Sequence, residues 1–168
     1  MAGDWIDRAE AICHTCGGRC CTGACPPLST ERVRIILSDG PYADKIERNG
    51  YWRIRMKSNG ECAMMEKGRC LIHAIKPETC RAGPFTFSVT GNSIEIFLKR
   101  ESVCPLVSYL KADQEMYARQ YTHAAKCITG LVKAIPEDEL RVISSIPEPE
   151  TDKIAEIPRY SGRIHDRH

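Results

Sequence analysis

The chain has 168 residues, which is enough for one domain with a modest hydrophobic core rather than for two domains. Its formal net charge of +2 gives no reason to expect a nucleic-acid partner, and no apolar run is long enough for membrane insertion. The N-terminus lacks the basic start and apolar stretch of a secretory signal, so we expect a cytoplasmic protein.

Ten cysteines are the main compositional feature of the chain. In a secreted protein such a number would indicate a disulfide framework. In a reducing compartment, clustered thiols are more often metal ligands or redox groups. The absence of a signal sequence therefore favours a metal-binding protein.

The N-terminal third is expected to be helical around a cysteine-rich loop. Residues 1–12 are predicted to form a short helix, and residues 13–27, rich in cysteine, glycine and proline, a loop. Ser29 or Thr30 can cap a helix that runs to about Ser38. Pro41 can then start a second short helix, which Asn49-Gly50 would end.

The middle of the chain shows the alternation of apolar and polar residues that is typical of short strands. Residues 51–57 alternate apolar and basic side chains, which predicts a half-buried strand. Residues 61–65 and 69–72 are predicted to form a short hairpin around Lys67-Gly68, followed by a helical turn over 74–81. Residues 85–90 and 93–99 form a second predicted hairpin around Gly91-Asn92.

The clearest predicted helix begins at a cap on Asp113 and ends at Pro136, because apolar residues recur at helical spacing between them. The residues after it are mostly polar and interrupted by prolines. We therefore divide the chain into a cysteine-rich metal or iron–sulfur domain, residues 1–135, and an extended or disordered C-terminal tail, residues 136–168, that can act as a docking arm. The expected fold class is α+β, a small metal-centred domain with short antiparallel hairpins and a long C-terminal helix.

The cysteines form two clusters along the sequence. The first contains Cys13, Cys16 and the adjacent pair Cys20-Cys21. A spacing of two residues lets both sulfurs turn toward one metal, and dense spacing of this kind is common in iron–sulfur loops. The second cluster comprises Cys62, Cys70, Cys80 and Cys104, and it lacks the paired CxxC spacing of a zinc ribbon.

These clusters resemble a known family, the zinc- or iron-chelating domains with a CxxCxxCC-type signature, which includes the cysteine-rich part of flagellin lysine-N-methylases. The resemblance covers roughly residues 13–105, and its most specific part is Lys76-Pro77-Glu78-Thr79-Cys80-Arg81 with Pro84-Phe85. The chain departs from the family pattern in one extra residue between Cys16 and Cys20. It also has His73 where the family usually has Tyr, and Lys76 in place of Arg.

The predicted metal ligands are the cysteines that fit the pattern: Cys13, Cys16, Cys20, Cys21, Cys62, Cys70, Cys80 and Cys104. A 4Fe-4S cluster needs only four thiolates, so some of these are spare, serve a second metal, or form a redox pair. The expected cofactor is an iron–sulfur cluster, with zinc as the alternative. Cys25 lies outside the pattern, Cys127 is better explained by core burial, and His73 by hydrogen bonding rather than ligation.

Three functions are compatible with this chemistry. We expect a redox- or oxygen-responsive accessory protein that docks on a larger enzyme complex. The family resemblance implies an alternative, a protein lysine N-methyltransferase that uses S-adenosylmethionine. However, the chain shows no glycine-rich nucleotide fingerprint and no Ser-His-Asp set or paired carboxylates, so an independent enzyme is not favoured. The third possibility is a zinc-binding structural module.

Overall fold

A computed structural model describes residues 2–16, 23, 25–148 and 150–159. It has the expected α+β composition, with short antiparallel hairpins and one long helix. Within the described residues, no helix combines the length and the apolar character needed to cross a bilayer.

The first helix is longer than the sequence predicts. Helix α1 spans Ala2–Cys16, so the loop expected from residue 13 is wrong for residues 13–16. Ala9 and Ile12 lie one turn apart and pack against the main hydrophobic core, which favours continuing the helix past residue 12. As a result Cys13 and Cys16 lie on the last turn of α1, and their i, i+3 spacing brings them to one face of the helix.

Residues 26–57 form one side of the molecule. Helix α2, Thr30–Asp39, is capped by Ser29, whose hydroxyl accepts a hydrogen bond from the Arg32 backbone N–H. The helix expected over 41–49 is reduced to a 3₁₀ turn, η2 (Ala43–Lys45), and then becomes strand β1 (Ile46–Arg48). Ile46 pairs with Ile54 of strand β2, Trp52–Ile54, and both side chains are buried, so hairpin packing overrides helix formation here.

The hairpin predicted around Lys67-Gly68 is confirmed but is shorter than expected. It consists of β3 (Met65–Glu66) and β4 (Arg69–Cys70), and both turn residues have positive φ angles, 50° and 75°. The predicted helical turn over 74–81 is divided into η3 (His73–Ile75) and α3 (Glu78–Arg81). Pro77 separates them, because it has no backbone N–H to donate to the preceding turn.

A small hydrophobic core joins these elements. Its fully or nearly buried members are Leu28, Ile36, Ile46, Ile54, Cys62, Ala63, Met64, Met65 and Ile72. Cys70 packs against it as a partly buried neighbour. We call this the α2-side core.

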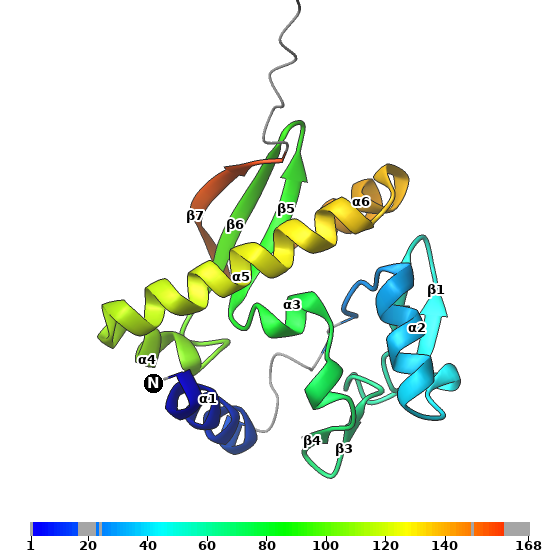
Figure 1. The fold of residues 1–168 in the computed structure, drawn as a ribbon, viewed down its shortest axis with the longest axis horizontal. Helices are drawn as coiled ribbons and strands as arrows, with labels where there is room; N and C mark the ends of the chain where they lie inside the picture. The colour runs from blue at the N-terminus through cyan, green and yellow to red at the C-terminus, as the bar shows by residue number, and fades with distance from the viewer. Residues whose placement is uncertain (1, 17–22, 24, 149, 160–168) are drawn as a thin grey trace, which may run out of the picture.

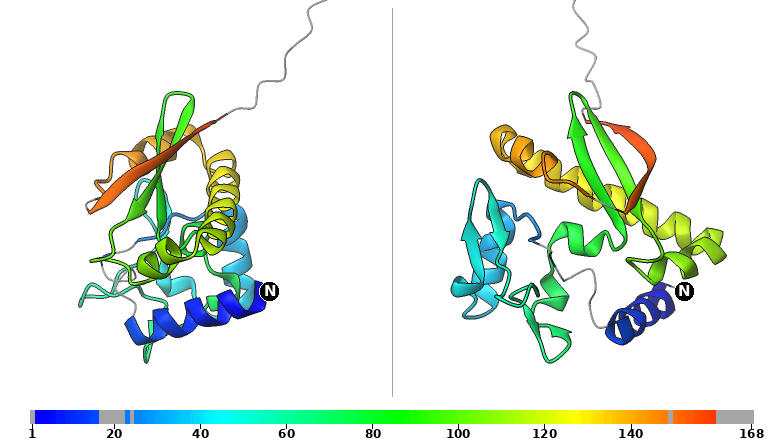
Figure 2. Two further views of the ribbon diagram at one scale, coloured as in Figure 1. Left: turned by 90° about the vertical axis from the view of Figure 1, so that its left-hand side faces the viewer. Right: turned by 180° about the vertical axis from the view of Figure 1, so that it is seen from behind.

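The other side of the molecule is a three-stranded antiparallel sheet in the order β5-β6-β7, covered by helices. Strands β5 (Phe85–Thr90) and β6 (Ser93–Lys99) match the prediction residue for residue. Helix α5, Gln114–Ala134, is capped by Asp113 as expected and crosses the sheet (Figures 1 and 2). A short helix, α4 (Leu106–Ala112), precedes it and was not predicted.

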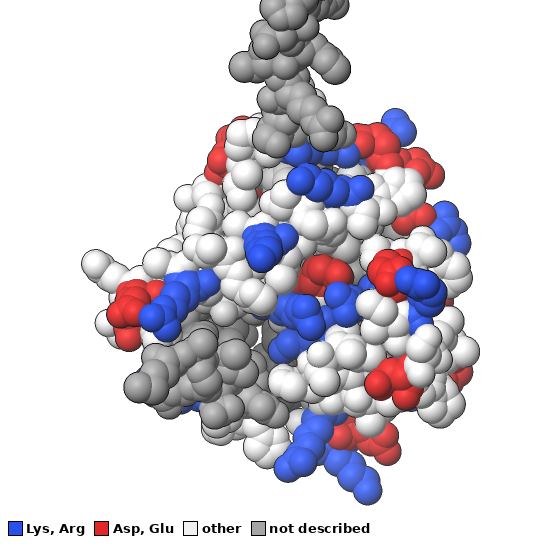
Figure 3. All heavy atoms as spheres, in the orientation of Figure 1, with Lys and Arg blue, Asp and Glu red and all other residues white. Residues whose placement is uncertain are grey.

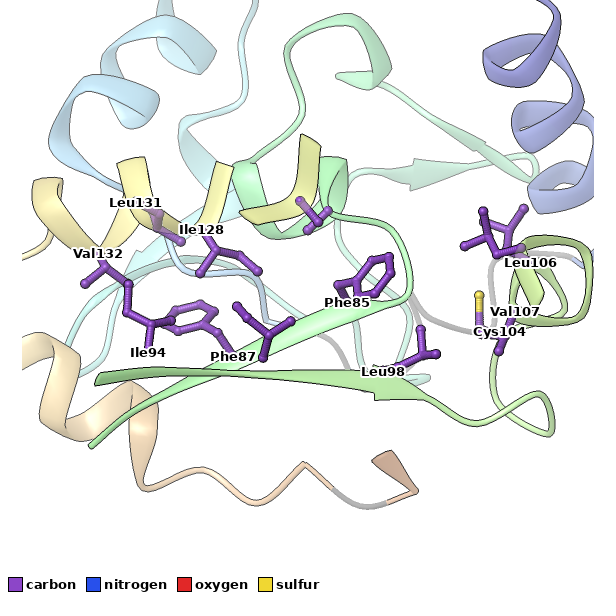
Figure 4. Close-up of a cluster of buried hydrophobic side chains, with 14 of the residues drawn as sticks. Phe85, Phe87, Ile94, Leu98, Cys104, Leu106, Val107, Ile128, Leu131 and Val132 are labelled. Atoms are coloured by element: carbon purple, nitrogen blue, oxygen red, sulfur yellow. The ribbon is translucent and has the colours of Figure 1, made fainter. Parts of the chain in front are cut away.

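The main core lies between this sheet and the helices. Phe85 is at its centre, fully buried and in edge-on contact with the rings of Tyr117 and Tyr121. Figure 4 shows apolar side chains of α5 facing those of β5 and β6, including Ile128, Leu131 and Ile94. Cys104 and Leu106 extend the same core to α4.

The expectation of an unpacked tail from residue 136 is wrong for the described residues of this segment. Glu137–Ser144 form helix α6, whose Leu140 is 1% exposed in the main core. Thr151–Pro158 form strand β7, which pairs along the whole of β6. The prolines at 136 and 158 mark element ends rather than disorder, and residues 160–168 of the predicted tail lie outside the described part of the chain.

Specific polar contacts join the two sides. Arg48 of β1 bonds Glu139 of α6 at 2.7 Å, and Glu139 is only 5% exposed. Within the sheet side, Arg159 bonds Glu137 and fixes the end of β7 to the start of α6. Elsewhere on the surface shown in Figure 3, basic and acidic side chains are interspersed, so neither sign dominates that face.

Candidate metal centre

Three cysteines of the predicted metal set line one small pocket. Cys13 and Cys16 come from the last turn of α1, and Cys104 comes from the residues just before α4. The rest of the lining is apolar and comes from the same two segments: Ile12, Val103, Pro105 and Leu106. We call this the α1 pocket.

Packing between α1 and α4 forms the α1 pocket. Ile12 contacts the main core, which orients the last turn of α1 toward residues 103–106. The Cys104 backbone N–H donates to the Arg100 carbonyl at 3.1 Å, so Cys104 is held in a turn at the start of α4 (Figure 4). Cys104 is buried, Cys16 is half-buried and Cys13 is exposed, so the sulfurs span the boundary between core and solvent.

A second set of thiols, Cys25, Cys62 and Cys70, lies at the α2-side core. Cys62 is 7% exposed and is followed by a tight turn in which the Met65 backbone N–H donates to the Cys62 carbonyl at 3.0 Å. Met65 is paired with Cys70 across the β3–β4 hairpin, so this turn and hairpin bring Cys62 and Cys70 to the same place. We call the three residues the α2-side thiols.

Burial is the largest influence on each of the α2-side thiols, and it raises the pKa of all three. The negative charges of Cys70 and Cys25 raise the pKa of Cys62 further, so Cys62 lies within electrostatic reach of both. In the opposite direction, a backbone hydrogen bond at Met64 lowers the pKa of Cys62 and one at Ile72 lowers that of Cys70. One cation also lowers the pKa of each thiol: Arg53 for Cys25, Lys57 for Cys62 and Lys76 for Cys70.

The two sets of cysteines lie in different parts of the molecule. In Figures 1 and 2, α1 and α4 lie on one side, while α2 and the β3–β4 hairpin lie on the other. Cys20 and Cys21 fall outside the described residues, in the stretch of chain that links Cys16 of the first set to Gly23 near the second. Cys80 lies on α3, half-buried, and α3 packs on α5.

His73 and Cys127 are the other candidates that the sequence raised. His73 is exposed at the start of η3. Cys127 is half-buried on α5 rather than in the core, and its sulfur lies 3.7 Å from Nε2 of His123. Burial raises the pKa of Cys127, which Arg81 partly offsets.

Thiolate sulfur is the donor that both zinc and iron–sulfur clusters take, so the residues of both sets fit a zinc- or iron-binding role. Among the described residues, no three cysteine, histidine or carboxylate side chains lie close enough together to hold a single metal ion as they stand. Ligation at either set would therefore need a change in the positions of these side chains or donors from outside the described residues.

Sequence reasoning missed the cations beside the thiols and the position of Cys25. The sequence pattern predicts only that Lys57 points away from the apolar face of a strand. In the structure its neighbour Met56 pairs with Cys62 in an antiparallel β-bridge, which brings Lys57 near the Cys62 thiol. The rigid Pro26-Pro27 pair after Cys25 was the available signal, because it indicates an extended segment suited to pairing with another strand.

One comparison with known proteins bears on this site. The family model named CxxCxxCC, described as "Putative zinc- or iron-chelating domain", matches residues 12–105. The match begins on the last turns of α1 and ends at the start of α4, so it contains both sets of thiols. Neither a curated protein nor a solved structure matches the chain.

Proposed function

Because the chain belongs to the CxxCxxCC family of zinc- or iron-chelating domains, we propose that it is an iron–sulfur protein that acts as a redox-responsive accessory to a larger enzyme complex. Metal binding is the part that the family assigns; the 4Fe-4S cluster, the redox response and the docking are the proposal.

The observation that carries the proposal is the meeting of Cys13 and Cys16 with Cys104 at the α1 pocket. Cys104 is distant in sequence from Cys13 and Cys16, and the adjacent pair Cys20-Cys21 follows Cys16 within five residues. Three thiols at one pocket, with two more within a few residues of Cys16, make five candidates for the four thiolates that a 4Fe-4S cluster requires.

The position of the α1 pocket suits a redox centre. Its apolar lining would limit water around a cluster, and the exposed Cys13 would leave one edge open to solvent or to a partner. A cluster with four thiolates carries net negative charge that changes on electron transfer, and burial makes that change more costly than in water. Loss or oxidation of the cluster would release Cys13 and Cys16, and with them the end of α1, from the metal.

Docking would use the surface around the α1 pocket and apolar residues that remain exposed. Tyr109 on α4 is 46% exposed. A change at the α1 pocket would be transmitted to Tyr109 through α4, because Cys104 lies directly before that helix. Release of the α1 end would thus alter the surface that a partner contacts.

The test is purification of the full chain without oxygen, followed by iron, sulfide and zinc analysis. A cluster should give a brown protein with broad absorption near ~400 nm that bleaches in air. Colourless protein with stoichiometric zinc after reconstitution would favour the zinc structural module instead.

The docking part needs its own test, a pull-down under anaerobic and air-exposed conditions with wild type and Tyr109→Ala. A partner that is lost in air and weakened by Tyr109→Ala supports the accessory role. The absence of any partner, together with lysine methylation by the isolated chain in the presence of S-adenosylmethionine, would support the methyltransferase alternative.

A further inference from the structure

The two edges of the three-stranded sheet differ in what covers them. At the β5 edge, helix α6 packs against the strand, and the Val89 backbone N–H donates to the Ser144 hydroxyl at 3.0 Å. The opposite edge is β7, Thr151–Pro158, and among the described residues no strand pairs with its outer side (Figures 1 and 2). A strand edge of this kind presents a row of backbone groups with which another chain can pair.

Backbone hydrogen bonds at the C-terminal end of β7 show which of its residues face outward. The Arg159 backbone N–H donates to the Asn92 carbonyl at 2.7 Å. Hydrogen-bonded pairs alternate along an antiparallel ladder, so Ile157 and Ala155 also direct their backbone groups toward β6. The backbone N–H and carbonyl of Glu156 therefore point away from the sheet.

The N-terminal end of β7 follows the same alternation with a shift of one residue. There the Arg100 backbone N–H donates to the Glu150 carbonyl at 2.9 Å, which directs the backbone of Lys153 outward. The shift occurs opposite residues 96 and 97 of β6, where the register changes as in a β-bulge. Because of this shift, Lys153 and Glu156 both face outward although they are three residues apart.

The two outward positions carry opposite charges on one face of the sheet. Nζ of Lys153 lies 3.0 Å from Oε2 of Glu156 and 3.0 Å from Oε1 of Glu95 on β6. The Lys153 and Glu156 side chains are 44% and 52% exposed, so a second chain can reach them. A lysine and a bulge on an edge strand oppose pairing with most other strands. Pairing at this edge therefore requires a partner strand with matching charges and a matching bulge.

A second copy of β7 meets both requirements in one register. In an antiparallel pair with twofold symmetry, an axis at Lys153 or at Glu156 would place like charges opposite each other, which is destabilising. An axis between Ile154 and Ala155 instead places Lys153 of each copy opposite Glu156 of the other. The same register brings Ile154, which is 37% exposed, to the axis from both copies.

We propose that the chain forms a homodimer through β7, in which two copies of the strand pair antiparallel with Lys153 of each opposite Glu156 of the other. The two three-stranded sheets would then continue into one another across the twofold axis. This interface goes beyond the proposed function, and it requires no metal at the α1 pocket.

The experiment measures the mass of the full chain in solution by analytical ultracentrifugation over a range of concentrations. Wild type should reach twice the mass of one chain. Lys153→Glu and Glu156→Lys each place two pairs of like charges in the interface, so each variant alone should be a monomer. The control is Lys133→Glu at an exposed position of α5, which makes the same charge change as Lys153→Glu and should remain a dimer.

Mixing the two β7 variants tests the register itself. Their edges are complementary in charge, so an equimolar mixture of Lys153→Glu and Glu156→Lys should recover the dimer mass, which variants that fail to fold could not do. Monomeric wild type at every concentration, or a dimer that neither variant weakens, would overturn the proposal. A mixture of the folded variants that stays monomeric would overturn the register.

Hydrogen exchange in wild type covers the case in which a variant does not fold. In the dimer the amides of Lys153 and Glu156 bond the partner strand, so their protection should be lost on dilution to the monomer. The amides of Ala155 and Ile157 face β6 and should stay protected at both concentrations. Exchange at Lys153 and Glu156 that does not change with concentration would overturn the assignment of the interface to β7.

Discussion

Arg32 of α2 and Glu78 of α3 form a two-point contact that joins the α2-side core to the segment before Cys80. Nη2 of Arg32 lies 2.8 Å and Nε 3.3 Å from Oε1 of Glu78. Nη1 of Arg32 also donates to the Ile75 carbonyl at 3.2 Å, so one guanidinium holds both η3 and α3. The two side chains are 13% and 19% exposed, and Oε2 of Glu78 is buried without a hydrogen-bond partner among the described residues.

This contact predicts a clear stability effect. Glu78→Ala should lower the free energy of unfolding by about 2 kcal/mol, because it leaves the Arg32 guanidinium largely buried with only one backbone acceptor. The matched control is Glu115→Ala, which breaks an exposed pair with Arg119 and should cost at most about 0.5 kcal/mol. Denaturant unfolding measures both. Equal effects of the two substitutions would show that the Arg32–Glu78 contact has no special role.

Cys104 provides a direct test of the α1 pocket. Cys104→Ser should lower iron content and remove the absorption near ~400 nm, because a hydroxyl is a poor replacement for a thiolate ligand. The control is Cys127→Ser on α5, another cysteine that is at least half-buried, which should retain the iron and the absorption. Retention of full iron by Cys104→Ser would remove this residue from the ligand set.

The elements that sequence predicts well are those whose side chains carry their own periodicity or turn chemistry. The β5–β6 hairpin follows from alternating residues around Gly91-Asn92, and Gly91 has the expected positive φ of 58°. Helix α5 follows from its apolar spacing and the Asp113 cap, which accepts from the backbone N–H groups of Glu115 and Met116.

The elements that sequence predicts poorly depend on distant partners. Strand β7 carries mostly exposed residues, and it is a strand because β6 offers a free edge. The same holds for the metal centre: spacing identifies the cysteines, but only the packing of α1 on α4 selects Cys104 as the neighbour of Cys16. Cys25 could not be assigned from a local pattern, because its position depends on pairing with residues 54–60.

The segment after Pro136 is predicted to be part of the folding unit. Truncation after Pro136 removes buried Leu140 and exposes the β6 edge, so it should abolish the cooperative unfolding transition or greatly reduce its midpoint. Truncation after Arg159 keeps every described contact of α6 and β7 and should leave the transition unchanged. Thermal unfolding followed by circular dichroism compares the two. An unaltered transition after truncation at Pro136 would contradict this role for α6 and β7.

The contact between Glu137 and Arg159 predicts an acid-sensitive part of stability. The hydrogen bond from Arg159 holds the pKa of Glu137 below its usual value. A carboxylate with a lowered folded-state pKa stabilises the fold above its unfolded pKa, and this contribution is lost as pH falls through the folded value. Wild type should therefore be more stable than Glu137→Gln at pH 7, and the difference should shrink at acidic pH. A difference that grows on acidification would exclude this contact as its source.

Metal removal should loosen the two sides of the molecule unequally. The α2-side core has few buried residues and is built from α2 with short strands and turns, whereas the main core packs the long helix α5 and the short helix α6 on a continuous three-stranded sheet. Metal ligation supplies folding free energy where a hydrophobic core is small, so the α2-side core should depend on it more.

After chelation, hydrogen exchange should accelerate at amides that pair the Cys25 and Cys62 segments with residues 52–57, such as those of Leu28 and Ala63. Amides in the β5–β6 ladder, such as Phe87 and Ile96, should retain their protection. The control is Cys127→Ser, which lies outside both sets of thiols and should show the wild-type exchange pattern with and without chelator. Uniform acceleration across both cores would instead mean that the metal stabilises the chain as one cooperative unit.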